Sequence, residues 1–197
     1  MNDAATRDVY DAEAARYAAM TDAHNRADPR LADFMAALPA GGAVLDLGCG
    51  PGSAAEVMAQ AGFDVEAMDA SPAMVDMAAA RDGVRAVLGG FDDITGETVY
   101  DGVWANFSLL HATREDMPRH LAAIRRALRA GGVFHIGLKT GTGAARDRLG
   151  RFYTYYEEDE LTDLLETAGF IPRARHRGVD PGLDGADAPW ITVLSDG

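Results

Sequence analysis

A glycine-rich segment directly after an apolar run constrains the fold of this chain more than any other feature. The segment VLDLGCGPGS covers residues 44–53 and contains Gly48, Gly50 and Gly52. Glycine is favoured where φ is positive or where a ligand must approach the main chain closely. A strand followed by such a loop and a helix N-terminus can bind the polar part of a nucleotide, because free amides converge there. The segment therefore predicts a nucleotide-binding α/β fold.

Apolar segments alternate with helical patterns along the chain, which is typical of βαβ units and a parallel sheet. Five strands are predicted, at 43–47, 64–69, 84–88, 100–106 and 133–138. Helices are predicted to begin at Ser53, in a capping box with Glu56, and at Pro72 behind Ser71 as N-cap, and to span 115–130 and 157–168. Two further strands, at 171–177 and 190–194, are joined by a Pro/Gly/Asp-rich linker. They predict an antiparallel hairpin at the edge of the parallel sheet.

Composition limits the class of protein and its partners. The 197 residues suffice for one domain with its own core, and the single cysteine, Cys49, cannot form an intramolecular disulfide. A net charge of -13 disfavours nucleic acid and membrane surfaces as partners. The N-terminus MNDAATRDVY contains charges where a secretory signal needs an apolar stretch, so we expect a cytoplasmic protein. His24, His120 and His176 lack metal-ligand spacing, and no metal site is predicted.

The spacing of the glycines favours S-adenosylmethionine over a dinucleotide. In the dinucleotide pattern G-x-G-x-x-G the third glycine would fall at Ser53, whereas here it is Gly52. Asp46, inside the predicted strand, would repel a pyrophosphate but suits the ammonium group of S-adenosylmethionine. Asp69, about twenty residues beyond the loop, can accept hydrogen bonds from a ribose of either ligand. An NAD(P)-dependent oxidoreductase therefore stays open as an alternative.

Four stretches resemble the successive motifs of the class I S-adenosylmethionine-dependent methyltransferases: VLDLGCGPGS, DVEAMDASPAMVDMA, YDGVWANFSLLHA and IRRALRAGGVFHI. The resemblance implies a doubly wound, Rossmann-like, seven-stranded and mostly parallel sheet with a C-terminal antiparallel hairpin. It implies S-adenosyl-L-methionine as cofactor, with its methionine part on the glycine loop, its ribose on Asp69 and its sulfonium beside Asn106 and Phe107. It places the adenine between Met74 and Phe91, with its amine on Asp92. The predicted cofactor-binding residues are Tyr17, Asp46, Gly48, Cys49, Gly50, Gly52, Asp69, Ala70, Met74, Phe91, Asp92, Asn106 and Phe107.

The fourth strand ends in NFSLLHA and lacks the N-P-P-[YFW] tetrapeptide of nucleic-acid and glutamine methyltransferases, which favours a small-molecule acceptor. We expect a single methyltransferase domain over 1–197, with a helical lid at 1–38 and a core at 39–197. His111 is the candidate general base, and packing of the helix that follows is the alternative role. The predicted acceptor-binding residues are Tyr10, His111, Arg146, Arg151 and Tyr153, the arginines suiting a carboxylate or phosphate. A non-catalytic module that binds S-adenosylmethionine also stays open.

Overall fold

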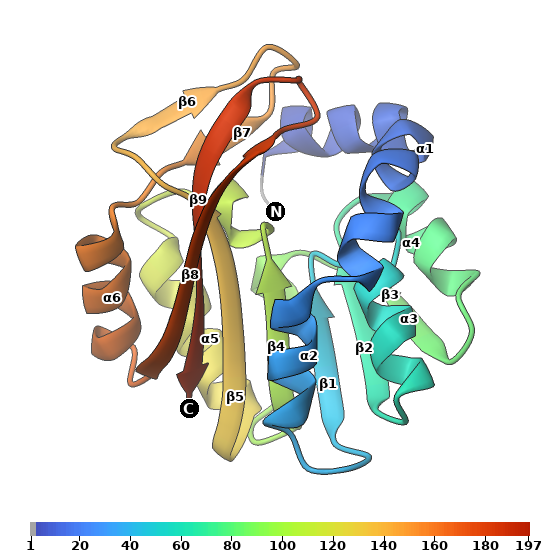
Figure 1. Ribbon diagram of the computed structural model, residues 1–197, viewed down its shortest axis with the longest axis vertical. Helices are drawn as coiled ribbons and strands as arrows, with labels where there is room; N and C mark the ends of the chain where they lie inside the picture. The colour runs from blue at the N-terminus through green and yellow to red at the C-terminus, as the bar shows by residue number, and fades with distance from the viewer. Residues whose placement is uncertain (1–2) are drawn as a thin grey trace.

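The computed structural model describes residues 3–197, which form one seven-stranded sheet with helices on both faces (Figure 1). The strand order is β3-β2-β1-β4-β5-β9-β8. Strands β1 to β5 are parallel, while β9 is antiparallel to both β5 and β8. The strands are β1 (Ala43–Leu47), β2 (Asp64–Asp69), β3 (Val84–Leu88), β4 (Tyr100–Asn106), β5 (Leu128–Lys139), β8 (Ile171–Pro181) and β9 (Asp187–Asp196). The predicted fold class, including the C-terminal hairpin, is confirmed.

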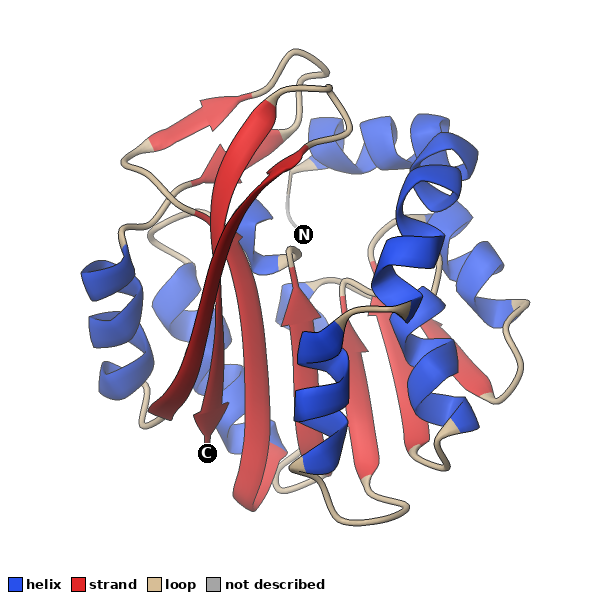
Figure 2. Ribbon diagram, in the orientation of Figure 1, coloured by secondary structure: helices blue, strands red, loops and turns tan. Residues whose placement is uncertain are grey.

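The helices and the remaining short elements connect these strands (Figure 2). A separate two-stranded ribbon, β6 (Ala144–Arg146) with β7 (Phe152–Thr154), lies near the end of β5. Two 3₁₀ turns, η1 (Phe91–Asp93) and η2 (Leu109–His111), follow β3 and β4. The α-helices are α1 (Ala4–Arg26), α2 (Pro29–Ala36), α3 (Ser53–Gln60), α4 (Pro72–Ala79), α5 (Met117–Ala127) and α6 (Glu158–Thr167).

Two apolar clusters fill the spaces on either face of the sheet. On β1, Val44 belongs to the cluster beneath α2, α3 and α4, whereas Leu45 and Leu47 belong to the cluster beneath α5 and α6. This alternation follows from the period of two in a strand. The chain runs outward from β1 to β3 and then returns to β4 on the other side of β1. Ligands of doubly wound sheets bind outside the carboxyl ends of the strands at such a switch point.

Helix α3 begins differently from the predicted capping box. Its N-cap is Gly52, with φ of 77°, and the cap has no side-chain hydrogen bond. Ser53 Oγ instead donates to Asp22 Oδ1 of α1 at 2.6 Å, and the Glu56 carboxylate pairs with Arg81 at 3.1 Å. The capping box was wrong because both of its side chains are used to attach other helices. The predicted cap of α4 is confirmed, with Ser71 Oγ accepting from the amide of Met74.

Several element boundaries also differ from the prediction, and β5 begins at Leu128 rather than at residue 133. Helix α5 ends at Ala127 rather than at residue 130, because Leu128 takes an extended conformation and pairs with Tyr100 of β4. The side chain of Leu128 is buried, so the core holds the chain in that position. Strands β8 and β9 continue further toward their connecting turn than predicted, and pair from Ile171↔Asp196 to Pro181↔Asp187. The longer hairpin brings that turn close to the carboxyl ends of the parallel strands.

Helix α1 lies beside the carboxyl-end edge of the sheet, next to α3 and α4 (Figure 1). Asp11 accepts hydrogen bonds from Ser71 Oγ and the Ala73 amide at the start of α4. Nearer the N-terminus of α1, Thr6 Oγ1 accepts from the amide of Phe152 in β7. The helix therefore spans from the β6–β7 ribbon to the start of α4.

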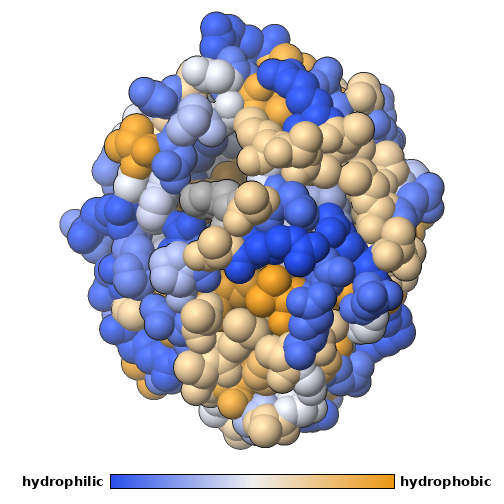
Figure 3. Space-filling model, turned by 45° about the vertical axis from the view of Figure 1, so that its right-hand side comes forward, coloured by the Kyte–Doolittle hydropathy of each residue, from blue (hydrophilic) through white to orange (hydrophobic). Residues whose placement is uncertain are grey.

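The surface contains both polar and apolar residues. On the face shown in Figure 3, hydrophilic residues lie beside broad areas of weakly hydrophobic residues and smaller strongly hydrophobic ones. The large hydrophobic side chains that are exposed among the described residues are spread over several segments: Met20 on α1, Leu88 on β3, Val99 before β4, and Ile171 and Val179 on β8. Within residues 3–197, no helix combines the length and the apolar character needed to cross a membrane.

Candidate active site

The glycine loop between β1 and α3 exposes its backbone because its three glycines have positive φ. The φ values of Gly48, Gly50 and Gly52 are 72°, 55° and 77°, a region that other residues rarely adopt. The amide of Gly48 donates to the Met68 carbonyl at 2.7 Å, which folds the loop against the end of β2. A Cβ at Gly48 would lie 2.3 Å from Ser108 Cβ. This position has no room for a side chain.

Asp69 connects the glycine loop to α4. Its Oδ2 accepts from the Gly50 amide and its Oδ1 from the Ser71 amide, both at 2.9 Å. Burial raises the pKa of Asp69, although these two backbone donors act in the opposite direction. Each carboxylate oxygen has a further lone pair available to a ligand. The geometry therefore suits recognition of paired hydroxyl groups.

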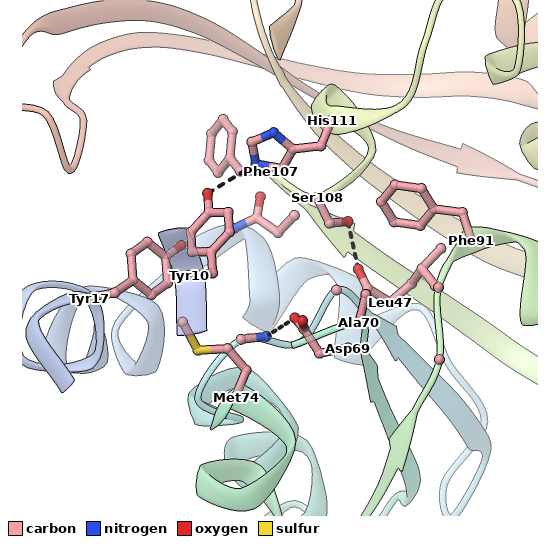
Figure 4. A pocket seen from close by; sticks show the side chains of 15 residues that line it. Tyr10, Tyr17, Leu47, Asp69, Ala70, Met74, Phe91, Phe107, Ser108 and His111 are labelled. Carbon is pink, nitrogen blue, oxygen red and sulfur yellow. Dashed lines mark hydrogen bonds between the residues drawn. The ribbon is translucent and has the colours of Figure 1, made fainter. Parts of the chain in front are cut away.

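A pocket of about 500 Å³ lies beyond the ends of β1 and β4, between α1 and the strands (Figure 4). Eleven of the predicted site residues line it: Tyr10, Tyr17, Gly48, Gly50, Asp69, Ala70, Met74, Phe91, Asn106, Phe107 and His111. Four lining residues were not predicted: Leu47, Gly89, Gly90 and Ser108. Gly89 and Gly90 could have been found from the sequence, because they follow the third predicted strand directly. Adjacent glycines at such a position mark a place where a ligand can approach the backbone closely.

A smaller polar cavity joins this pocket along the glycine loop, and Asp46 and Cys49 line it. Asp46 is 3% exposed, and its Oδ2 is buried without a hydrogen-bond partner among the described residues. Burial, followed by the charge of Asp69, raises the pKa of Asp46 to about 8. Burial also raises the pKa of the Cys49 thiol well above its usual value. Such a thiol is a poor nucleophile, because the thiolate is the reactive form.

The end of β4 holds a strained residue at the mouth of the pocket. Phe107 has φ of 57°, in the left-handed region, and its amide donates to the Gly137 carbonyl at 3.0 Å. Its neighbour Asn106 bonds through Oδ1 to His135 Nε2 at 3.1 Å, and His135 stacks on Trp104. Strain in a non-glycine residue persists only where the surroundings hold it, and it often marks a functional site. Here His135, stacked on Trp104, fixes the side chain of Asn106, which precedes Phe107.

Tyr10 of α1 borders the pocket, and its hydroxyl lies against His111 (Figure 4). The Phe152 carbonyl oxygen lies 2.6 Å from His111 Nδ1 and can only accept, so Nδ1 carries the proton. His111 Nε2 therefore accepts from the Tyr10 hydroxyl, at 3.0 Å. Burial, together with the charges of Arg151 and Lys139, lowers the pKa of His111 to about 3. The imidazole is neutral at physiological pH.

A second cavity, of about 770 Å³, lies between α1, the tip of the β8–β9 hairpin and the end of β5. It shares four lining residues with the first pocket: Tyr10, Tyr17, Asn106 and Phe107. Tyr153 and Arg151, both predicted to bind the acceptor, also line it, together with Lys139 and Trp190, which were not predicted. The four shared residues mark the place where the two cavities meet.

The two arginines predicted to bind an acceptor anion already have carboxylate partners. Arg151 donates through Nε and Nη2 to Asp147 Oδ2, at 2.9 and 2.6 Å, and through Nη1 to the Tyr10 hydroxyl at 3.0 Å. Arg146 is exposed and pairs with both oxygens of Asp3, at 2.7 and 2.9 Å. Only Arg151 lines the second cavity. In this arrangement both guanidinium groups stabilise the position of neighbouring segments.

Two predicted cofactor residues, Gly52 and Asp92, line neither the pocket nor the smaller cavity that joins it. The Asp92 carboxylate pairs with Arg119 on the partly exposed side of η1. Gly52 serves helix packing, because a Cβ there would lie 2.9 Å from Ala78. Within the described part of the chain, no group of three or more His, Cys, Asp or Glu side chains could hold a metal ion.

The chain is similar in part to known methyltransferases. A family model described as "Methyltransferase domain" matches residues 44–132, which include the glycine loop, Asp69 and the end of β4. A crystal structure of Burkholderia thailandensis 1,6-didemethyltoxoflavin-N1-methyltransferase, with bound 1,6-didemethyltoxoflavin and S-adenosylhomocysteine, superposes with a TM-score of 0.80. The two are 26% identical, and the match covers 98% of this chain and 87% of the other.

Two curated relatives match over shorter stretches. One is a cypemycin N-terminal methyltransferase from Streptomyces sp, 39% identical over 99 residues, or 47% of this chain and 40% of the relative. The other is a sarcosine/dimethylglycine N-methyltransferase from Aphanothece halophytica, 33% identical over 122 residues, or 57% of this chain and 43% of the relative. The chain thus matches less than half of the length of either relative.

Proposed function

From the match to a methyltransferase domain and the likeness to a methyltransferase structure, we propose that the chain is a class I S-adenosylmethionine-dependent methyltransferase that transfers a methyl group to a nitrogen atom of a small molecule. The observation that carries this proposal is the pair of buried carboxyl groups, Asp46 and Asp69, on either side of the glycine loop. Two such groups disfavour the pyrophosphate of a dinucleotide but suit a ligand with a ribose and an ammonium group.

The side chains around the loop fit this cofactor. Asp69 would accept from the ribose hydroxyls, and the unpartnered Oδ2 of Asp46 would receive the ammonium group, directly or through water. Met74 and Phe91, both buried in the wall of the pocket, would contact the adenine ring. The loop, with no side chain at Gly48 and Gly50, would allow the methionine part to lie against the backbone.

The bound cofactor supplies a methyl group already activated by a positively charged sulfur, so the protein mainly has to orient the acceptor and exclude water. Orientation of this kind contributes about 7–11 kcal/mol to lowering a barrier. Asn106 and Phe107, at the junction of the two cavities, would separate the cofactor from the acceptor and align them. Tyr10 and Tyr17, whose rings meet edge to face, would cover the same junction.

We assign His111 a positioning role in the closed arrangement. Its Nε2 already accepts a hydrogen bond from Tyr10, so a proton from the acceptor would reach it only through that hydroxyl. With a pKa near 3 it is also a weak base. We propose that His111 and Arg151 together hold Tyr10, and with it α1 as a lid, over the core.

The names of the three relatives support nitrogen as the acceptor atom, since each describes methylation of an amine or a ring nitrogen. A neutral amine attacks without a strong base, which agrees with the positioning role assigned to His111. A cytoplasmic location and the lid role stay predictions.

Calorimetric titration tests the cofactor, and turnover tests the reaction. We expect micromolar binding of S-adenosylmethionine and S-adenosylhomocysteine and no binding of NAD or NADP. A panel of small amines, assayed for release of S-adenosylhomocysteine above spontaneous breakdown, should contain substrates. Binding of NAD would restore the oxidoreductase alternative, and cofactor binding without any turnover would favour a regulatory module.

A further inference from the structure

The second cavity contains the one lysine of the entire sequence. The chain has 17 arginines and a single lysine, Lys139, at the last position of β5. Lys139 pairs in register with Trp190 of β9, and both line the second cavity. Its Nζ lies 4.1 Å from the centre of the Tyr153 ring, which is part of the same wall. The ammonium group therefore belongs to the cavity rather than to the outer surface.

Lys139 differs from the other cation of this cavity in lacking a carboxylate partner. Among the described residues, no carboxylate oxygen lies within 4 Å of its Nζ, whereas Arg151 is held by Asp147. The nearby carboxylates are in use: Asp147 binds Arg151, and Asp184 accepts from the Ala186 amide at 3.2 Å and lies 3.7 Å from Arg148.

A half-buried ammonium group without a paired carboxylate lowers the stability of the protein, because the charge is partly removed from water. A ligand that supplies the opposite charge would offset this loss. Burial and the charge of Arg151 lower the pKa of Lys139, as expected for a cation that lacks a counterion. Asp180 lines the same cavity, but its Oδ2 accepts from Trp190 Nε1 at 2.8 Å. A ligand with one negative charge would balance Lys139, whereas a phosphate carries about 1.5–2 charges and would find no second free cation here among residues 3–197.

We infer that Lys139 binds a carboxylate of the acceptor, so that the substrate class is an amine that carries a carboxylate on an apolar or aromatic body. The inference rests on the proposed function, because it assigns the second cavity to the acceptor. The aromatic walls formed by Phe107, Tyr153 and Trp190 would contact the body of the substrate. The amine would then face the junction at Asn106 and Phe107, where the cavities meet.

The single lysine makes a direct test possible. Reductive methylation with ¹³C-formaldehyde labels only Lys139 and the N-terminal amine and keeps the charge of both. The labelled protein, saturated with S-adenosylhomocysteine, would be titrated with amine carboxylates and the matching carboxamides: the aminobenzoates and aminobenzamides, and sarcosine and sarcosinamide. We expect a saturable shift of the Lys139 signal alone, with carboxamides at least about 10-fold weaker, because a charged hydrogen bond is lost.

Variants of the unmodified protein complete the test. Lys139→Met should weaken binding of the best carboxylate by about 10- to 100-fold, and Lys139→Arg should recover part of it. Affinity for S-adenosylhomocysteine should be unchanged in both variants. Arg173→Met, which removes a cation paired with Asp196 near the far end of the hairpin, is the matched control and should change neither affinity.

The inference is overturned if no carboxylate in the panel shifts the Lys139 signal, if Lys139→Met binds it as the wild type does, or if amine phosphates bind more tightly. Failure of the proposed function has a different signature, namely no binding of S-adenosylhomocysteine to the wild-type protein.

Discussion

Asp46 provides a prediction in which stability and cofactor binding oppose each other. Its carboxyl group is buried beside the glycine loop with one oxygen unpartnered, and its pKa is raised to about 8. In the unfolded chain the pKa of an aspartate is about 3.9. Between these two values the folded protein binds one more proton than the unfolded chain, so its free energy of unfolding falls as pH rises.

The size of this effect follows from the difference between the two pKa values. About 4 pKa units, each worth about 1.36 kcal/mol, give a loss of roughly 5–6 kcal/mol by about pH 8. Asp46→Asn removes the titration and keeps the shape of the side chain. The variant should match the wild type near pH 4 and become more stable by about 1.4 kcal/mol per pH unit up to about pH 8.

Urea unfolding of both proteins at several pH values measures this difference. The other titrating groups contribute equally to the free energy of unfolding of both proteins, so the comparison removes contributions of opposite sign such as that of His111. Lowering of the His111 pKa to about 3 makes stability rise with pH between that value and about 6.5. Above about pH 8, where Asp46 is ionised, the same variant should bind S-adenosylmethionine at least about 10-fold more weakly, because it loses a charged acceptor for the ammonium group. A stability difference that does not change with pH would mean that Asp46 does not take up a proton on folding.

Three further substitutions test the site. Gly50→Val should abolish measurable binding of S-adenosylhomocysteine in calorimetry, since φ of 55° strains a branched residue; normal binding would show that the loop does not hold the ligand. Asp69→Asn should weaken S-adenosylmethionine by about 10- to 100-fold, and unchanged affinity would contradict the ribose assignment. For His111→Ala, kcat should fall by the same factor at about pH 6 and about pH 9, because a group with a pKa near 3 does not titrate there; a loss confined to one end of that range would identify a titrating base.

The cofactor half of the site was predictable from the sequence because backbone geometry determines it. Glycines with positive φ after β1, and an acid at the end of β2, occupy positions that the strand pattern fixes. Asp46 and Asp69 could be placed from local patterns alone, since each lies in or at the end of a predicted strand.

The acceptor half was not predictable, because its side chains are placed by contacts between distant segments. The sequence showed an arginine and tyrosine cluster, yet Arg146 pairs with Asp3, which lies 143 positions away along the chain. Lys139 gave no local signal beyond being unique, and its exposure to the cavity depends on the turn of the β8–β9 hairpin. Ser53 matched a capping pattern, but α1 offered Asp22 as a stronger partner for its hydroxyl.

A crystal structure of the complex with S-adenosylhomocysteine tests the central claim most directly. We expect ribose hydroxyls on the Asp69 carboxylate, the amino group within reach of Asp46, and the sulfur directed to the junction formed by Asn106, Phe107, Tyr10 and Tyr17. A ligand bound elsewhere, or one whose sulfur points away from the second cavity, would contradict the assignment of the two cavities to cofactor and acceptor.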